Sequence, residues 1–200
     1  SGTISSAGQQ LSGIDVSGLS DGTLTVSLVL TDSNGNAATA VTNTSTLDTS
    51  APSGHSISFD DSAINSSEAS SIGLTMANAE VGASYSYNIS SSGGGTPVIG
   101  SGTVSSAGQQ LSGVDVSGLS DGTLTVSLVL TDTNGNAATA VTNTSTLDAN
   151  APSGHRISFD DSSINSTDAS SISLTMANAE VGASYSYSIS SSGGGTAVTG

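Results

Sequence analysis

The side chains of this chain that could do chemistry are almost all carboxylates and amides. Its 200 residues include 16 Asp and Glu but only one Lys or Arg, so the formal net charge is −15. The clearest grouping is the run Asp132-Thr-Asn134-Gly-Asn136, which recurs at residues 32–36. Oxygen ligands without a neighbouring cation favour Ca²⁺, which takes about six to eight oxygens in flexible geometry.

Three other interpretations of this run are a zinc or copper site, an EF-hand and a plain hairpin turn. Zinc and copper prefer His or Cys, and the chain has two histidines and no cysteine. The run is not an EF-hand, because Ala137 holds the position of the invariant glycine and Asn143 stands where a bidentate Glu is expected. The simplest alternative is that Asn-Gly forms a hairpin turn and that the acids only keep the repeat soluble.

The composition argues against several classes of function. Arg156 is the only Lys or Arg, so nucleic acids and anionic membrane surfaces would be repelled. No stretch approaches the roughly 18 apolar residues of a membrane span. The segment Gly118-Leu-Ser-Asp-Gly122 matches the nucleophile elbow of hydrolases, but it joins two predicted strands and not a strand and a helix. We therefore expect no nucleic-acid partner, no membrane span and no catalysis.

The elements that position these residues belong to a repeat. Residues 1–100 and 101–200 are two copies of one unit that differ at 13 positions. A period of this length fits one whole domain better than a solenoid repeat of about 20 to 50 residues. Near-identity of the copies is typical of a repetitive spacer, whose partners are neighbouring identical repeats.

Alternating apolar residues predict short β-strands throughout the unit. At 123–131, Leu124, Val126, Leu128 and Leu130 would share one face of a strand. Further strands are predicted at 57–59, 72–76, 85–89, 109–116 and 137–147. About seven short strands in about 100 residues predict an all-β fold of tandem immunoglobulin-like antiparallel β-sandwich domains.

Pro52 and its copy Pro152 mark the linkers, because proline cannot donate a ladder hydrogen bond and a fresh strand follows each one. We predict the C-terminal half of a preceding repeat at 1–48, a complete repeat at 49–148 and the N-terminal half of a following repeat at 149–200. Half sandwiches expose an apolar face and unpaired strand edges. Residues 149–200 of one chain are therefore expected to complete residues 1–48 of the next, head to tail.

The loops of such a sandwich would gather the acids at its two ends, with Asp48 and Asp148 in the linkers between domains. Carboxylates brought together repel one another unless a cation bridges them, so we predict Ca²⁺ at and near the joints. The candidate ligands are Asp15, Asp21, Asp32, Asn34, Asn36, Asp48, Asp60, Asp61, Glu68, Glu80, Asp115, Asp121, Asp132, Asn134, Asn136, Asp148, Asp160, Asp161, Asp168 and Glu180.

Several segments in combination resemble a known type of domain. They are Asp121-Gly-Thr-Leu-Thr-Val, Leu130-Thr-Asp-Thr-Asn-Gly-Asn-Ala, Leu147-Asp-Ala-Asn-Ala-Pro152, Ile157-Ser-Phe-Asp-Asp and Ala179-Glu180-Val-Gly-Ala. They resemble bacterial immunoglobulin-like repeats, above all the extender repeats of large RTX adhesins, including ice-binding and biofilm adhesins. The resemblance implies a type I-secreted, surface-held stalk whose domains bind calcium at their joints and project a distal binding domain from the cell. The alternative is a calcium-dependent carbohydrate- or ligand-binding module, which the absence of Trp disfavours.

Overall fold

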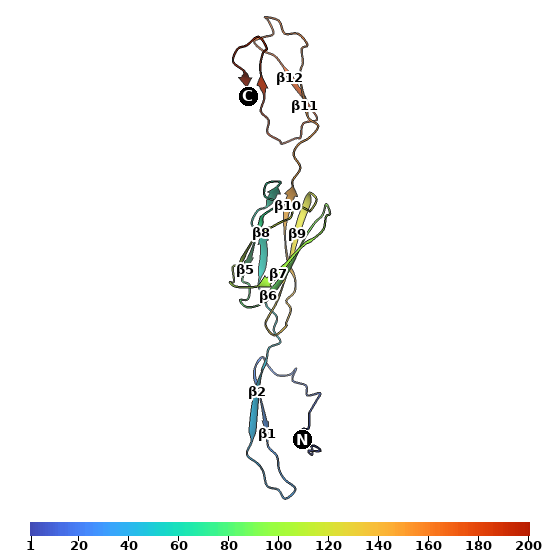
Figure 1. Cartoon of the computed structure of the whole chain (residues 1–200), viewed down its shortest axis with the longest axis vertical. Coiled ribbons are helices and arrows are strands. Elements are labelled where there is room, and N and C mark those ends of the chain that lie inside the picture. Colours follow the sequence, from blue (N-terminus) through green and yellow to red (C-terminus); the bar gives the residue numbers. More distant parts are fainter. The chain divides into compact units, whose positions relative to one another are not determined.

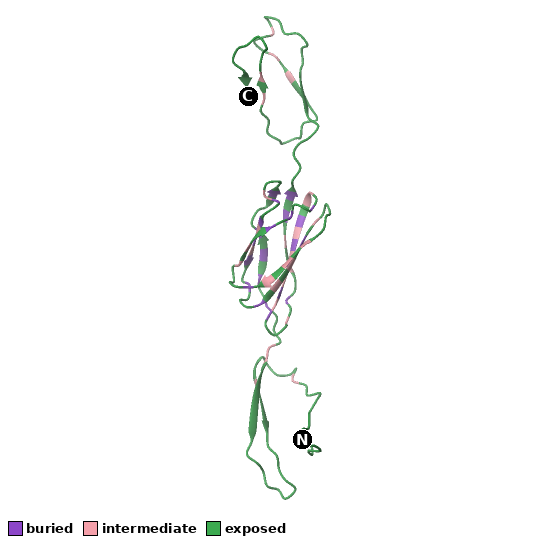
Figure 2. Ribbon diagram, in the orientation of Figure 1, coloured by how far each residue is buried: buried purple, intermediate pink, exposed green.

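The computed structural model describes all residues from Ser1 to Gly200, and its regular elements are all β-strands. The chain divides into two compact units, Ser1–Asp148 and Ala149–Gly200. Every buried residue lies between Pro52 and Leu147, within the first unit (Figure 2). The hydrophobic core therefore belongs to the segment that the sequence predicts to be a complete repeat, whereas the boundary predicted between residues 48 and 49 stays a prediction.

Two facing sheets form a sandwich around this core (Figure 1). One sheet has the order β3-β5-β8, with β3 (Ser56–Phe59), β5 (Ile72–Ala77) and β8 (Gln110–Val114). The other has the order β4-β10-β9-β6-β7, with β4 (Ala63–Asn65), β10 (Val141–Asp148), β9 (Gly122–Thr131), β6 (Ser84–Ser91) and β7 (Val98–Thr103). Every pairing is antiparallel except that of β4 with β10. The predicted all-β, immunoglobulin-like architecture is confirmed.

The first strand of the sandwich is split between the two sheets, a feature that the alternation of apolar residues does not predict. β3 pairs with β5, and after the turn at residues 60–62 β4 pairs with β10. The hydroxyl of Ser145 on β10 donates to the carbonyl oxygen of Asp61 at 2.7 Å, which holds the crossing point. Alternation of apolar residues marks a strand but not its partner, because the partner is distant in the sequence.

The parallel pairing of β4 with β10 decides where the chain enters and leaves the sandwich. β4 lies close to the entry and β10 is the last strand, and the two run in the same direction. The chain therefore enters at one end of the sandwich and leaves at the opposite end. Domains built this way can be joined in series through short linkers.

Strand β9 supplies the centre of the core. Leu124, Val126, Leu128 and Leu130 are all fully buried, as the alternation predicts. Across the sandwich, Leu74 and Met76 of β5 are also fully buried. Full burial of each such side chain contributes about 1.5–3 kcal/mol.

The remaining part of the first unit repeats the β9–β10 hairpin without its cover. β1 (Gly22–Leu28) and β2 (Val41–Leu47) pair in the register of β9 and β10, with Leu24 opposite Ser45 as Leu124 is opposite Ser145. Nevertheless Val26 is 64% exposed, whereas Val126 is fully buried. The hairpin forms from its own sequence, but its apolar face stays open.

The second unit repeats the N-terminal half of the sandwich. Its strands are β11 (Arg156–Phe159), β12 (Leu174–Ala177), β13 (Ser188–Ile189) and β14 (Val198–Thr199). β11 and β12 keep the register of β3 and β5, since Phe159 lies opposite Leu174 as Phe59 lies opposite Leu74. Phe159 is exposed, whereas Phe59 is buried in the complete sandwich.

Candidate functional site

The linker residue Asp48 contacts the loop between β9 and β10. The side-chain Nδ2 of Asn134 donates to Oδ2 of Asp48 at 2.6 Å. Nδ2 of Asn136 donates to the backbone carbonyl oxygen of Asp48 at 3.0 Å. The structure therefore brings together a linker acid and the Asp-x-Asn-Gly-Asn run, two features that the sequence predicts to meet at a joint.

Asp132 organises this loop from within. Its Oδ1 accepts hydrogen bonds from the backbone nitrogens of Asn134 at 2.9 Å and Asn136 at 2.8 Å, and its Oδ2 accepts one from Asn136 Nδ2 at 2.8 Å. Asp132 is buried. The side-chain hydrogen bond from Asn136, more than the backbone bonds, lowers the pKa of Asp132 below its ordinary value.

The equivalent loop of the first copy has the same internal geometry. Oδ1 of Asp32 accepts from the backbone nitrogens of Asn34 at 2.9 Å and Asn36 at 2.8 Å, and Oδ2 accepts from Asn36 Nδ2 at 2.9 Å. This loop forms on an exposed hairpin, so its local sequence suffices to fold it. The tertiary structure adds the contact between the second copy of the loop and the linker.

The linker is also held from the preceding hairpin. Oδ1 of Asp21 accepts from the backbone nitrogen of Thr49 at 2.9 Å and from its Oγ1 at 2.7 Å. The hydroxyl of Ser50 donates to Asp21 Oδ2 at 2.6 Å, and this bond is the main reason why the pKa of Asp21 is lowered. Thr49 and Ser50 were not among the predicted site residues, although two hydroxyl residues directly after a linker acid are a usable signal. We call residues 48–50 with Asp21, Asp132, Asn134 and Asn136 the linker clamp.

The donor chemistry of the linker clamp fits a calcium ion. The side-chain amides of Asn134 and Asn136 donate hydrogen bonds to three oxygens, which are Oδ2 and the carbonyl oxygen of Asp48 and Oδ2 of Asp132. If those amides rotate, their oxygens join the same set, and oxygen-only sets suit Ca²⁺. No three Asp, Glu or His side chains come together in a metal-binding group. A cation at the clamp would therefore be held by two carboxylates with amide and backbone oxygens.

Asp60 has a different environment from the clamp acids. Its Oδ1 accepts from Thr75 Oγ1 at 2.6 Å and its Oδ2 accepts from Gln110 Nε2 at 2.8 Å. These partners lie on β5 and β8, so the carboxylate ties three strands of one sheet together. In the second unit Asp160 keeps the corresponding bond to Thr175 at 2.6 Å.

The other candidate acids lie in loops and turns or at strand ends. Oδ1 of Asp115 accepts from the hydroxyl of Ser117 at 2.7 Å, which is the main reason for the lowered pKa of Asp115. Oε2 of Glu68 accepts from the backbone nitrogen of Asn65 at 3.0 Å. The remaining members of this group are Asp15, Asp61, Glu80, Asp121, Asp148, Asp161, Asp168 and Glu180.

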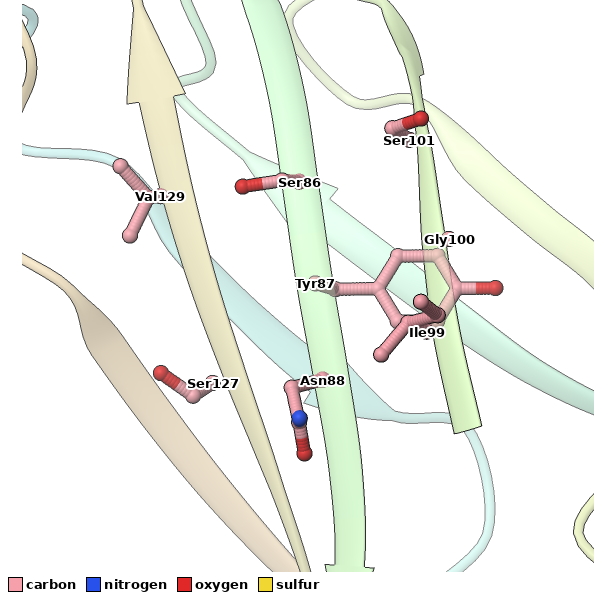
Figure 3. A pocket seen from close by; sticks show the side chains of 8 residues that line it. All are labelled: Ser86, Tyr87, Asn88, Ile99, Gly100, Ser101, Ser127 and Val129. Carbon is pink, nitrogen blue, oxygen red and sulfur yellow. The ribbon is translucent and has the colours of Figure 1, made fainter. Parts of the chain in front are cut away.

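The outer face of the five-stranded sheet carries a shallow hollow of about 580 Å³ (Figure 3). Its lining comes from β6, β7 and β9 and includes no charged side chain. Figure 3 shows the ring of Tyr87 reaching from β6 across Gly100 on the edge strand β7, where a larger residue would clash with the ring. The neighbouring ring of Tyr85 stacks on it, with centroids 6.5 Å apart. A glycine covered by an aromatic ring stabilises an edge strand, so this feature is structural.

Several solved structures are similar to the chain, including the following three. A tetra-tandem repeat in the extending region of a large adhesion protein is 28% identical, over 95% of this chain and 47% of that chain, with a TM-score of 0.46. A 1.5-MDa bacterial ice-binding adhesin, in a structure concerned with retention on the host cell surface, is 28% identical over 64% and 42%, with a TM-score of 0.40. The D00-D0 domain of intimin is 20% identical over 64% and 67%, with a TM-score of 0.31.

The chain is similar to repeats of large adhesins. It spans less than half the length of the first two of these solved chains. No protein-family model matches it, and no curated protein matches it.

The segment Gly118–Gly122, which matches the nucleophile elbow in sequence, connects two strands, β8 and β9. The backbone nitrogen of Ser120 donates to the carbonyl oxygen of Gly94 at 3.0 Å, and its carbonyl oxygen accepts from Ser91 Oγ at 2.5 Å. A nucleophile elbow needs a helix after the turn, and here a strand follows.

No helix of the structure is long and apolar enough to cross a bilayer.

Proposed function

We propose that this chain is a calcium-rigidified extender of a large bacterial surface adhesin, which acts outside the cell and projects a distal binding domain from it. The observation that carries the proposal is the linker clamp. Its linker, residues 48–50, is bound by Asp21 on one side and by Asn134 and Asn136 on the other. A linker bound on both sides restricts bending between consecutive repeats.

The topology of the sandwich suits a stalk. Because β4 and β10 run parallel, each domain takes the chain in at one end and releases it at the other. Near-identical copies then add length without adding a new recognition surface. The alternative, a calcium-dependent carbohydrate-binding module, has less support, because the hollow on the outer face has no carboxylate to hold an ion.

Calcium would act at the linker clamp through the groups that already converge there. Asp48 would supply a carboxylate and a carbonyl oxygen, Asp132 a carboxylate, and Asn134 and Asn136 their amide oxygens. The ion would supply positive charge that the clamp now receives only from N–H dipoles. An ion that binds only the folded state stabilises it by about 2.7 kcal/mol at a concentration 100-fold above Kd.

Thermal unfolding of the 200-residue chain in chelator, in millimolar calcium and in millimolar magnesium tests this proposal. We expect a rise of the midpoint that is specific to calcium. The matched variants Asp132→Asn and Asp32→Asn should separate the clamp from the equivalent loop, with the larger loss of calcium response in Asp132→Asn. An unchanged midpoint would refute the calcium part, and binding of the chain to a glycan array would favour the alternative.

We also propose that the open sheet faces are completed by a second copy of this chain, head to tail. The complete sandwich supplies a template for this interface, because its β9–β10 hairpin is covered by the sheet that contains β3 and β5. β1–β2 copies that hairpin, and β11–β12 copies β3–β5 in the same register. In the complete sandwich the backbone nitrogen of Phe59 donates to Asn143 Oδ1 at 3.3 Å. The corresponding contact between copies would join Phe159 of one chain to Asn43 of the next.

A further inference from the structure

Two Asn-Gly pairs lie at the exposed tips of the loops at 32–36 and 132–136. Gly35 and Gly135 have positive φ angles of 92° and 95°. In an Asn-Gly pair the glycine has no Cβ to shield its backbone nitrogen from the asparagine side chain. Such pairs are therefore the ones in which the side-chain amide is lost most readily.

We propose that both pairs are deamidation sites and that the linker clamp protects Asn134, so that deamidation there marks a joint that has opened. In the reaction the backbone nitrogen of Gly135 attacks Cγ of Asn134, a C–N bond forms, and ammonia leaves to give a cyclic imide. Water then opens the ring and leaves aspartate or isoaspartate. The net change is water in and ammonia out, without oxidation or reduction, and it adds one negative charge.

The structure explains why the two sites should react at different rates. Cγ of Asn134 must swing towards the nitrogen of Gly135, and the bond from Asn134 Nδ2 to Asp48 Oδ2 at 2.6 Å holds it in place. In the structure the side-chain amide of Asn34 makes no corresponding hydrogen bond, and only its backbone nitrogen donates, to Asp32 Oδ1.

The two loops are otherwise closely matched. Gly35 and Gly135 each donate their backbone nitrogen to the carbonyl oxygen of the loop aspartate, at 3.1 and 3.3 Å. Both asparagines are exposed. The only sequence difference within the run is Ser33 against Thr133. The chain therefore contains its own control for the effect of the clamp.

Deamidation of Asn134 would change the clamp itself. A carboxylate would replace the amide that now donates to Asp48, and two carboxylates at hydrogen-bond distance repel each other unless one is protonated or a cation bridges them. A joint held by an N–H donor would become one that requires a cation. The protection of Asn134 rests on the clamp contact and does not depend on calcium binding or on adhesion.

The test follows deamidation of the full chain in mildly alkaline buffer with chelator, by peptide mass spectrometry over days. We expect Asn34 to react about fivefold faster than Asn134 or more, a ratio that corresponds to a hydrogen bond of about 1 kcal/mol. Asp48→Ala should raise the rate at Asn134 to that at Asn34, and the control Asp148→Ala should change neither rate. In denaturant the two sites should react equally, which excludes the Ser33 and Thr133 difference as the cause.

Equal rates in the native chain, or a rate at Asn134 that Asp48→Ala leaves unchanged, would overturn the proposal. The variants Asn134→Asp and Asn34→Asp test the consequence by X-ray scattering in chelator. Asn134→Asp should increase bending at the joint, whereas Asn34→Asp should not. Because all of these measurements are made without calcium, their failure is distinguishable from a failure of the calcium proposal.

Discussion

The side-chain amide of Asn134 donates to the carboxylate of Asp48 across a separation of 86 positions in the sequence. The first residue belongs to a hairpin loop of the complete sandwich and the second to the linker that precedes it. Their contact converts two locally folded features into a joint. Asp48 in the linker and Asn134 in the loop can each be substituted separately to test the contact.

Replacement of Asp48 by Ala should loosen the joint without unfolding the sandwich. Asn134 loses its acceptor, the carboxylate of Asp48, whereas the backbone carbonyl oxygen that accepts from Asn136 remains. No core side chain changes. We expect the free energy of unfolding of the sandwich in urea to stay within about 0.5 kcal/mol of the parent value. In the same variant, ¹⁵N relaxation should show more independent motion of residues 1–47. Asp148→Ala is the matched control. Unchanged relaxation in Asp48→Ala would contradict the role of the clamp.

The two copies of one leucine should respond very differently to truncation. Leu128 is fully buried in the sandwich, whereas Leu28, with the same neighbours in sequence, is 47% exposed. Leu128→Ala should destabilise the sandwich by about 2–5 kcal/mol in urea unfolding, because it leaves a cavity. Leu28→Ala should leave that transition in place. Equal effects would show that the first hairpin is covered in solution.

A methyl group at Gly100 should destabilise the edge of the five-stranded sheet. The Tyr87 ring occupies the space that the new Cβ needs, so the ring or β7 must move. We expect a loss of about 1–3 kcal/mol and a changed tyrosine fluorescence. Gly118→Ala is the control, because nothing lies within 4 Å of its Cβ position. Native-like stability of Gly100→Ala would argue against the close approach.

Acid should weaken the loop and linker bonds of the clamp only at low pH. The pKa values of Asp132 and Asp21 are lowered from the ordinary value of 3.8, so these acids bind fewer protons in the folded state than in the unfolded state. Their contribution is therefore complete above about pH 4 and is lost as the pH falls through the lowered values. Amide chemical shifts of residues 132–136, followed by NMR, should stay constant from pH 7 to about 5. A transition near neutral pH would contradict this assignment.

The completion of open halves by a second copy should appear as association that depends on concentration. Val26→Asp would place a charge on the open face of the first hairpin, where Val26 is 64% exposed, and should abolish the association. Thr25→Asp, on the opposite face of the same strand, should leave it intact. The average mass from sedimentation equilibrium is the measurement, and a monomer at every concentration would refute the completion.

Much of the strand pattern could be read directly from residues. The alternation of Leu124, Val126, Leu128 and Leu130 predicted both β9 and the face that it buries. The Asp-x-Asn-Gly-Asn run predicted a turn, and the loop forms with the same bonds in both copies. The bonds within this loop are local, because residues no more than four positions apart supply them, and the alternation along β9 is likewise a property of consecutive residues.

Pairings over long distances in sequence were less accessible. The sequence pattern did not predict the split of the first strand into β3 and β4. It also did not predict that the hydroxyls of Thr49 and Ser50 donate hydrogen bonds to Asp21. The burial of His55, whose two ring nitrogens have no hydrogen-bond partner, also had no signal in the sequence. Each depends on which segments pack together, and alternation or composition does not identify packing partners.

The sequence by itself determined the repeat, the strand-forming segments, the acidic loops and the apolar face of each hairpin. The tertiary structure decided which of those faces is buried and which acids meet. Val26 and Val126 show the difference, since they have the same neighbours in sequence and the same strand register, yet one is exposed and the other is buried. A hairpin forms through its own hydrogen bonds, but an apolar side chain leaves water only where a second sheet covers it.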